Sequence, residues 1–400
     1  MIRATIRQCG GRLCQRLRSL AALECRLESL SGGNLWQDGR IAHGYGLVER
    51  QERRYSGPSA VVENLSQRRS VLLLTGVDRY SFLQGLVTND IEELQSDPSV
   101  ARCMYSLLLN HKGRFMHDMF VYNVGDAETS GNGSLLIDLH KPSLSSVVKV
   151  LKRYKLRSRV EIEDVSEKYS VLYSSHDSGD VLSSVASSHP CHTFKDPRHA
   201  ALGYRCLLER SPTSLSQDKD LDESTRAHVG LRYALGIPEG DLEIPSGRAI
   251  PLEFNTDALH GISYTKGCYM GQELTARTHF QGLVRKRLLP VTVSAVGGEL
   301  AAISRALEKA RIQDADGGGD AVDVVDPERN ARKGGKKVGS LLALQGGQGL
   351  ALLRLKGLMG KTVGLRVKSV SGDVTTFQAK VEASIPDWWP QEWYQSAQET

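Results

Sequence analysis

The first half of the chain alternates short apolar runs with segments of helical spacing. An apolar run at residues 70–74, closed by a Thr-Gly pair, predicts a strand. Asp78 then stands where a helix N-cap belongs, and a helix is predicted from the spacing of Phe82, Leu83, Leu86 and Val87. Two apolar runs at residues 105–109 and 115–122 flank a short polar loop that contains glycine, a pattern that predicts a β-hairpin.

A further strand and an amphipathic helix follow. Residues 135–137 are apolar and predict the strand, and Pro142 suits the first turn of the helix. The buried face of this helix is expected to consist of Leu144, Val147, Val148, Leu151 and Tyr154. Six Lys and Arg residues crowd its end, between positions 149 and 159. They either bind an anionic partner or simply complement the helix dipole, which favours cations at a helix C-terminus.

The pattern changes to short strands after about residue 285. Apolar runs predict strands at residues 341–344, 350–355, 362–370 and 375–381. The first two runs flank a Gly-rich turn and therefore predict a hairpin, while only residues 300–310 have helical character. We predict a separate, mostly β domain over residues 286–390. Within it, residues 314–337 mix Gly, Asp and Lys without periodicity, so a mobile insertion is expected there.

The composition is that of an ordinary globular protein of two or three domains. The chain has 400 residues, of which 40% are apolar and 24% charged. No segment approaches the ~18 consecutive apolar residues that span a membrane, so we predict no transmembrane segment. The seven cysteines form no CxxC pair, which indicates free thiols and no disulfide framework. They also include no compact set able to hold an iron–sulfur cluster alone.

Most of the net charge of +5 lies at the N-terminus. Residues 1–30 carry six Arg and two Glu, a net charge of +4, and subtracting this from +5 leaves +1 for the rest. A nearly neutral remainder argues against a nucleic-acid-binding surface. The N-terminal segment has no acidic residue before Glu24, and its dispersed apolar residues share one helical face. These features predict a mitochondrial transit peptide at residues 1–30, with a basic tail as the alternative, followed by a polar linker at residues 31–60.

The segment around Cys268 carries the strongest chemical signal. Gly267 and Gly271 bracket this cysteine, which indicates a sharp turn whose backbone can be approached closely. A helix is predicted to begin near Gly271. A thiol just before a helix N-terminus, two residues from Lys266, is favoured as the thiolate, which is the form that binds soft metals. The alternative is an inert, buried cysteine.

A longer motif surrounds Cys268. The sequence Lys-Gly-Cys-Tyr-Met-Gly-Gln-Glu at residues 266–273 is followed by Thr-Ala-Arg and then by Arg-Lys-Arg. This signature resembles that of the folate-binding, aminomethyltransferase-like proteins that assist iron–sulfur cluster assembly. Residues 82–90, 109–114 and 384–389 are also similar to segments of that family. With the transit peptide, the resemblance is to the mitochondrial members that act late in the maturation of [4Fe-4S] proteins.

The resemblance implies an α+β fold of the glycine-cleavage T-protein type. Two interleaved α+β subdomains would occupy residues 61–285, and a C-terminal β-barrel-like domain residues 286–390, around a central folate channel. The strands and helices predicted above are compatible with that fold. The resemblance also implies a location in the mitochondrial matrix and a role as an assembly factor rather than an enzyme.

By the same resemblance, Cys268 binds the cluster or its iron. One thiolate cannot complete a cluster, because iron–sulfur clusters normally take four protein ligands. The cluster would therefore be shared with a partner, for which an A-type iron–sulfur carrier protein is the natural choice. Supporting roles at the cluster site are expected for Lys266, Gly267, Gly271, Gln272, Glu273 and Arg277. The two cations would favour the thiolate or offset cluster charge, and Gln272 and Glu273 would orient the loop. The spacing of Glu273 and Arg277 also suits an ion pair.

Tetrahydrofolate is the cofactor that the resemblance implies. Glu253 is the expected pterin contact, since a carboxylate accepts paired N–H bonds from such a ring; further folate candidates are Asn89, Asn110 and Arg232. Relatives that transfer a one-carbon unit carry two adjacent aspartates where this chain has His117-Asp118. A mostly neutral imidazole cannot supply that negative charge. A folate-dependent aminomethyl transferase is therefore the alternative to the assembly factor, and a purely structural adaptor is the third hypothesis.

Overall fold

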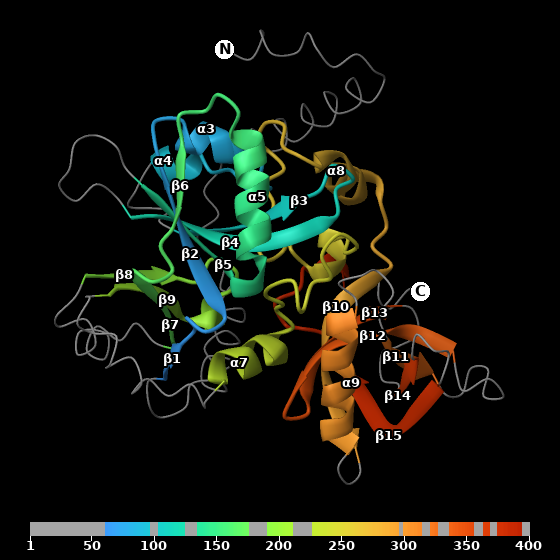
Figure 1. Cartoon of the computed structure of the whole chain (residues 1–400). Coiled ribbons are helices and arrows are strands. Elements are labelled where there is room, and N and C mark those ends of the chain that lie inside the picture. The colour runs from blue at the N-terminus through green and yellow to red at the C-terminus, as the bar shows by residue number, and fades with distance from the viewer. Residues whose placement is uncertain are drawn as a thin grey trace, which may run out of the picture. The chain divides into compact units, whose positions relative to one another are not determined.

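The computed structural model describes the chain from residue 61 to residue 393, with gaps (Figure 1). The described ranges are 61–96, 103–124, 134–175, 190–210, 226–295, 299–313, 321–326, 336–355, 363–368 and 374–393. They all belong to one compact unit, residues 55–400. The predicted transit peptide at residues 1–30 and the predicted linker at residues 31–60 lie outside the described residues.

Five antiparallel strands form the first sheet, in the order β3-β4-β5-β2-β6. They are β2 (Arg69–Thr75), β3 (Cys103–Leu109), β4 (Phe115–Asn123), β5 (Leu135–His140) and β6 (Glu161–Asp164). The predicted strands at residues 70–74 and 135–137 and the predicted hairpin are thus confirmed. Strands β3, β4 and β5 are buried on both faces. Their sequences therefore read as nearly continuous apolar runs rather than as alternating ones.

Helices cover one face of this sheet (Figure 1). They are α3 (Arg79–Gln84), α4 (Glu93–Ser96), the 3₁₀ turn η2 (Lys141–Ser143) and α5 (Leu144–Lys155). Val147 and Leu151 of α5 share a hydrophobic cluster with Leu72 of β2 and Ile137 of β5, so an apolar stripe holds the helix on the sheet. Tyr154 is 40% exposed, because the last turn of α5 is left uncovered, and its predicted place in that stripe is wrong.

The second sheet has four antiparallel strands in the order β1-β7-β9-β8. They are β1 (Val62–Asn64), β7 (Tyr169–Ser174), β8 (Cys191–Lys195) and β9 (Tyr204–Glu209). The 3₁₀ turn η3 (Ala200–Leu202) and helix α7 (Ala227–Leu235) follow β8 and β9 respectively. The chain starts in the second sheet with β1, builds the whole first sheet, and then returns for β7 to β9. The two α+β subdomains are therefore interleaved, as predicted.

Six strands close into a barrel at the C-terminal end of the chain, in the order β10-β13-β12-β11-β14-β15. They are β10 (Lys286–Ala295), β11 (Ala321–Asp326), β12 (Lys336–Gln345), β13 (Gln348–Arg354), β14 (Val363–Lys368) and β15 (Val374–Ala383). Helix α9 (Glu299–Gln313) contributes Ile303 and Leu307 to the hydrophobic cluster of the barrel. The predicted C-terminal barrel and the hairpin between residues 341 and 355 are confirmed.

One prediction for the barrel region is wrong. Residues 314–337 were expected to form a mobile insertion, but they contain β11, which pairs with both β12 and β14. Val322 and Val324 of this strand are buried in the barrel cluster. The Asp and Gly residues around this strand hide its short apolar pattern, although the barrel cannot close without it.

Polar contacts tie the barrel to the part of the chain that precedes it. Asn255 Nδ2 donates a hydrogen bond to Leu288 O at 2.9 Å, and Trp388 Nε1 donates to Leu235 O at 2.8 Å. Between the two sheets and the barrel in chain order lie the 3₁₀ turn η6 (Pro251–Phe254) and helix α8 (Gln272–Gln281). Among the helices that the structure describes, none has the length and apolar character needed to cross a membrane.

Candidate functional site

Cys268 lies on the loop that connects η6 to α8. It is exposed, whereas Cys103 and Cys191 are half-buried and Cys206 is buried. All four of these thiols are free. Among the described cysteines, Cys268 is therefore the most accessible to a partner molecule. Cys268 is therefore not the buried cysteine of the alternative hypothesis.

Two glycines fix the shape of this loop. Gly271, directly before α8, has a φ of 81°, and a Cβ added there would lie 2.4 Å from Asn110 O. Gly113 in the loop between β3 and β4 has a φ of 74°, and its added Cβ would lie 2.5 Å from Leu274 Cβ. Both positions require glycine, because the backbone is left-handed and the neighbouring segment is in close contact. The β3–β4 loop thus packs directly on the start of α8.

Lys266 anchors the loop from the other side. Its ammonium group donates hydrogen bonds to the carbonyl oxygens of Gln84, Val87 and Asn89, at 2.8, 2.8 and 2.6 Å. These carbonyls lie at and just beyond the C-terminus of α3, where a helix leaves acceptors without partners. Burial lowers the pKa of Lys266 to about 8, against the opposing effect of nearby carboxylates. The sequence suggested that Lys266 acts on the thiolate, but the structure shows it holding the loop on the first subdomain.

The remaining residues of the motif shape the turn after Cys268. Gln272 Oε1 accepts a hydrogen bond from Tyr269 N at 3.2 Å, and Tyr269 Oη lies 3.1 Å from Thr275 Oγ1. Glu273 and Arg277 are both exposed, and within the described part of the chain they form no ion pair with each other. Their spacing therefore leaves two separate charged groups on the outer surface of α8.

Two of the four folate candidates, Asn89 and Asn110, are hydrogen-bonded to backbone groups of the protein. Asn89 Nδ2 donates to Tyr105 O at 2.9 Å and to His260 O at 2.8 Å. Asn110 Oδ1 accepts from the backbone N–H groups of Lys112 and Arg114, at 2.9 and 3.0 Å, and so shapes the β3–β4 loop. Each of these asparagines is engaged within the protein itself.

Arg232 is likewise engaged, whereas Glu253 is not. Arg232 makes a two-fold ion pair with Glu243, at 2.6 and 3.0 Å. The Glu253 carboxylate forms no hydrogen bond or ion pair with any described residue. It lines a groove of about 270 Å³ with Ile250, Leu283 and Val284 among its walls. Burial raises the pKa of Glu253, against the opposing charges of Lys286 and Arg114. Glu253 is therefore the only one of the four candidates whose side chain has no hydrogen bond or ion pair with a described residue.

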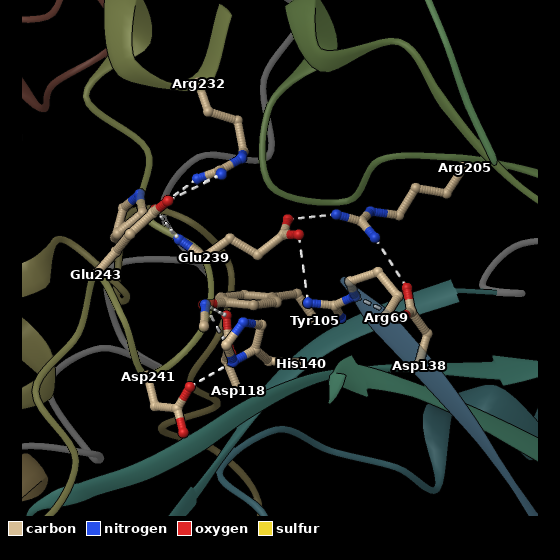
Figure 2. Close-up of polar contacts among 12 residues, drawn as sticks. Arg69, Tyr105, Asp118, Asp138, His140, Arg205, Arg232, Glu239, Asp241 and Glu243 are labelled. Carbon is tan, nitrogen blue, oxygen red and sulfur yellow. Dashed lines mark hydrogen bonds and ion pairs between the residues drawn. The ribbon is translucent and has the colours of Figure 1, made fainter. Parts of the chain in front are cut away.

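A buried ionic network joins the two sheets (Figure 2). Its side chains are less than 10% exposed, and they are Arg69, Arg198, Arg205, Arg232, Asp118, Asp138, Asp196, Glu239 and Glu243. Arg205 of β9 donates to Asp138 of β5 at 2.8 Å and also to Glu239. Because β9 belongs to the second sheet and β5 to the first, this arginine links the two subdomains.

Glu239 is the centre of the network. It pairs with Arg205, with Arg198 at 2.8 Å and with Arg69 at 3.3 Å. Burial alone would raise the pKa of Glu239, but Arg205, Arg69 and Arg198 together hold it well below its usual value. A buried carboxylate of this kind depends on its partners, because an unpaired charge in the interior is strongly destabilising.

His117 and Asp118 point to opposite faces of β4, as neighbouring strand residues do. Asp118 accepts a hydrogen bond from Tyr105 Oη at 3.1 Å and from Gly240 N at 3.1 Å, and burial raises its pKa. His117 Nε2 lies 3.0 Å from Ser146 Oγ, and burial lowers the pKa of the imidazole. His117 is thus neutral near pH 7, and the two side chains form no pair of adjacent negative charges.

Comparisons with known proteins identify the family. The domain family described as "CAF17, C-terminal beta-barrel domain" matches residues 285–391, which are those of the barrel. A Neurospora crassa protein named mitochondrial iron–sulfur cluster assembly factor IBA57 homolog is 32% identical over 398 residues, and the alignment covers 88% of each chain. The chain belongs to the IBA57 family of mitochondrial iron–sulfur cluster assembly factors.

Further IBA57 relatives agree with this assignment. The Mus musculus protein is 32% identical over 80% of this chain and 84% of its own length. The Coccidioides immitis homolog is 36% identical, but its alignment spans only 60% of that protein's length. All three are named mitochondrial, which supports the predicted location of the protein in mitochondria and is consistent with the matrix.

The fold comparison confirms the predicted architecture. The glycine cleavage system aminomethyltransferase T from Bartonella henselae superposes with a TM-score of 0.55, over 84% of this chain and 88% of its own. The two sequences are only 11% identical, so this likeness concerns the fold alone. The chain therefore has an aminomethyltransferase-like fold with a C-terminal β-barrel.

Sequence reasoning missed the ionic network and the anchoring role of Lys266. A signal for the network was present, since Asp118, Asp138 and Arg205 each interrupt an apolar strand where an uncharged residue is the rule. No comparable signal marked Lys266, because its three acceptors lie about 180 positions earlier in the chain.

Proposed function

We propose that this IBA57-family protein is a late-acting mitochondrial assembly factor for [4Fe-4S] proteins, and that Cys268 is its ligand to the cluster. The observation that carries the proposal is the exposure of Cys268 on a loop held by Lys266 and Gly271. A thiolate is the ligand that soft, sulfide-bridged iron prefers. A loop fixed on both sides presents that ligand in a constant position, which lowers the entropic cost of binding.

The cluster is cargo that this chain shares with a partner. Among the described residues, no group of three His, Cys, Asp or Glu side chains is placed to hold a metal ion. Cys268 thus supplies one of the four ligands that a cluster normally takes, and the others come from a second protein. An A-type iron–sulfur carrier is the partner proposed, because it must release a cluster and therefore needs a shared, exchangeable site. This partner contacts the exposed face around Cys268 and α8.

Tetrahydrofolate remains part of the proposal only through Glu253. Its unpaired carboxylate in a groove suits the 2-amino and ring N–H groups of a pterin, which donate two parallel hydrogen bonds. Asn89, Asn110 and Arg232 support the fold around it, because their side chains are bonded to the protein. The neutral His117 speaks for an assembly factor and against aminomethyl transfer, which in the relatives uses a carboxylate at that position.

The decisive experiment is Cys268→Ser in the full chain. A hydroxyl is close to a thiol in size but stays protonated at neutral pH, so it is a poor ligand for iron in a cluster. We expect the variant to unfold at the wild-type temperature, because Cys268 is exposed and contributes little packing. It should nevertheless lose the visible absorption of the cluster complex formed anaerobically with iron, sulfide and an A-type carrier. It should also fail to restore [4Fe-4S] enzyme activities in cells that lack the protein.

Matched controls are Cys103→Ser, Cys191→Ser and Cys206→Ser, which remove the three less exposed thiols. These variants should keep the cluster complex and restore the enzymes. If Cys268→Ser restores function and one of the controls does not, the proposal has selected the wrong cysteine. If all four variants restore function, this chain is not a cluster ligand and acts as an adaptor.

A further inference from the structure

Positive charge is concentrated in one segment of the folded chain. Residues 139–160 carry seven Lys and Arg and no acidic residue. Taking this +7 and the +4 of residues 1–30 from the total of +5 leaves −6 for the rest of the protein. The segment is therefore a basic region on an otherwise acidic chain, and it includes α5 and the turn that follows it (Figure 1).

Large exposed apolar side chains lie within or close to this basic segment. Leu156, directly after the end of α5, is 85% exposed, Tyr154 is 40% exposed and Val77 is 53% exposed. Leu156 and Asp78, the neighbour of Val77, line the same surface groove together with Arg157. We call the surface formed by Val77, Arg153, Tyr154, Leu156 and Arg157 the α5 tip.

The backbone at Leu156 is strained. Its φ is 43° and its ψ is −108°, at the helix C-cap, whereas glycine is the usual residue where φ is positive after a helix. A leucine here bears the strain of that conformation and gains no burial from it. Strained residues of this kind persist mainly where the conformation serves a purpose outside the fold itself.

The acidic groups near the α5 tip leave several cations unpaired. Asp78 occupies the N-cap position of α3, as predicted, but its carboxylate accepts hydrogen bonds from the backbone and side chain of Arg159 and makes none with the helix. Glu161 and Glu163 share a groove with Lys152 and Lys155, which reduces the net charge on that side.

Three cations remain after these contacts. Among the described residues, Lys149, Arg153 and Arg157 have no ion-pair partner, and all three are exposed. The two arginines flank Leu156 in the sequence, so the uncompensated charge surrounds the most exposed apolar side chain.

We propose that the α5 tip docks the protein on a membrane surface rich in anionic phospholipid. Arg153, Arg157 and Lys149 meet the headgroup phosphates, while Leu156, Tyr154 and Val77 enter the boundary between headgroups and acyl chains. Apolar insertion combined with a basic patch is the pair of signals that gives stable but reversible membrane attachment. An acidic peptide or a nucleic acid would meet the cations but leave Leu156 in water.

The expected binding is moderate and salt-dependent. Each Lys or Arg near an anionic surface strengthens binding by roughly fivefold, so removal of two weakens it by about 25-fold. Replacement of Leu156 by a polar residue should weaken binding by about tenfold or more, because the largest inserted side chain is lost. High salt should weaken the electrostatic part alone.

Vesicle co-sedimentation of the full chain tests the proposal. The Arg-rich N-terminus would itself bind anionic lipid, so the parent protein carries Arg12→Glu, Arg16→Glu and Arg18→Glu, which change the charge of residues 1–30 from +4 to −2. The probes are vesicles of phosphatidylcholine with about one third phosphatidylglycerol, and vesicles of phosphatidylcholine alone. The parent should bind the first and not the second.

Two variants of this parent locate the binding surface. Arg153→Ala/Arg157→Ala and Leu156→Ser should each reduce binding as stated above. The matched control, Lys195→Ala/Lys336→Ala, also removes two exposed cations and should bind like the parent. The proposal is overturned if the parent binds both kinds of vesicle equally or binds neither. It is also overturned if the control loses as much binding as the arginine variant. Binding of a polyanion such as heparin, without binding of vesicles, would overturn it as well.

Discussion

The role of Lys266 can be separated experimentally from that of Cys268, although only one residue lies between them in the sequence. Lys266→Met keeps the length and apolar stem of the side chain but removes the ammonium group that donates three hydrogen bonds to Gln84, Val87 and Asn89. Hydrogen bonds to a charged group contribute about 1.5–3 kcal/mol each when buried. Because the Lys266 side chain is only half-buried, water can replace part of these hydrogen bonds in the variant. We therefore expect the loop to lose about 2–3 kcal/mol of stability in total.

This loss should act locally, on the opening of the loop. A change of about 2–3 kcal/mol corresponds to roughly 30- to 150-fold faster hydrogen exchange of the amides between residues 264 and 271. The exchange of β3, β4 and β5 should change much less, because these strands open only with the whole fold. Mass spectrometry of exchanged peptides measures both regions in one experiment. Because the loop then samples other positions, the complex with the cluster carrier should weaken although Cys268 is intact.

The matched control is Lys195→Met, which removes an exposed lysine from β8. It should leave exchange near Cys268 and formation of the cluster complex unchanged. If Lys266→Met exchanges at the wild-type rate in this loop, the three hydrogen bonds do not hold it and the reasoning is refuted. If exchange accelerates but the cluster complex is as stable as before, the anchor serves folding alone and not presentation of the thiol.

Four further outcomes are expected. Glu239→Gln should lower the free energy of unfolding by about 3–5 kcal/mol, because it removes the one carboxylate that three buried arginines share. The exposed Glu161→Gln should change it by less than about 0.5 kcal/mol in the same denaturant titration. The pKa values of Glu239 and Asp196 are depressed in the folded state, so both carboxylates stabilise the fold at any pH above their unfolded pKa values of 4.5 and 3.8. This stabilisation is lost as the pH falls from those values toward the folded-state pKa values. A melting temperature that stays constant down to pH 3 would contradict this. Glu253→Gln should weaken tetrahydrofolate binding by about one to two decades in a fluorescence titration, and an unchanged titration would mean that this carboxylate is not the pterin contact. Deletion of residues 1–30 should leave the protein in the cytosol when cell fractions are blotted, and mitochondrial accumulation of that form would refute the transit peptide.

The elements that sequence predicts well are those whose apolar pattern is local. The hairpin of β3 and β4 and the hairpin of β12 and β13 each contain their own turn, so both partners and the connection are visible together. The helix after Gly271 is similar, since a glycine before a run of helical residues marks the start of α8. Strand β11 was missed because the Asp and Gly residues around it hide its short apolar pattern.

The same distinction between local and distant signals applies to the residues of the candidate site. The exposure of Cys268 and the need for glycine at position 271 follow from a short motif and its neighbours. The function of Lys266 depends on a helix end from a distant part of the chain, and a motif cannot show that. The folate candidates Asn89, Asn110 and Arg232 were inferred from a family resemblance, and only the structure shows that they are already bonded to other atoms of the protein.

The interleaving of the two sheets also sets the order in which this chain can fold. Val62 of β1 pairs with Ser174 of β7, and β9 must lie between β7 and β8 before the second sheet is complete. A chain that enters the organelle with its N-terminus first therefore carries an unpaired β1 until residues up to 174 have followed, and its second sheet is incomplete until residue 209. Pairings between strands that are distant in the sequence slow folding, and strand edges stay exposed until the later strands are present. We therefore expect this protein to depend on matrix chaperones during import, and fragments that end before β9 to be degraded rather than accumulate as a folded subdomain.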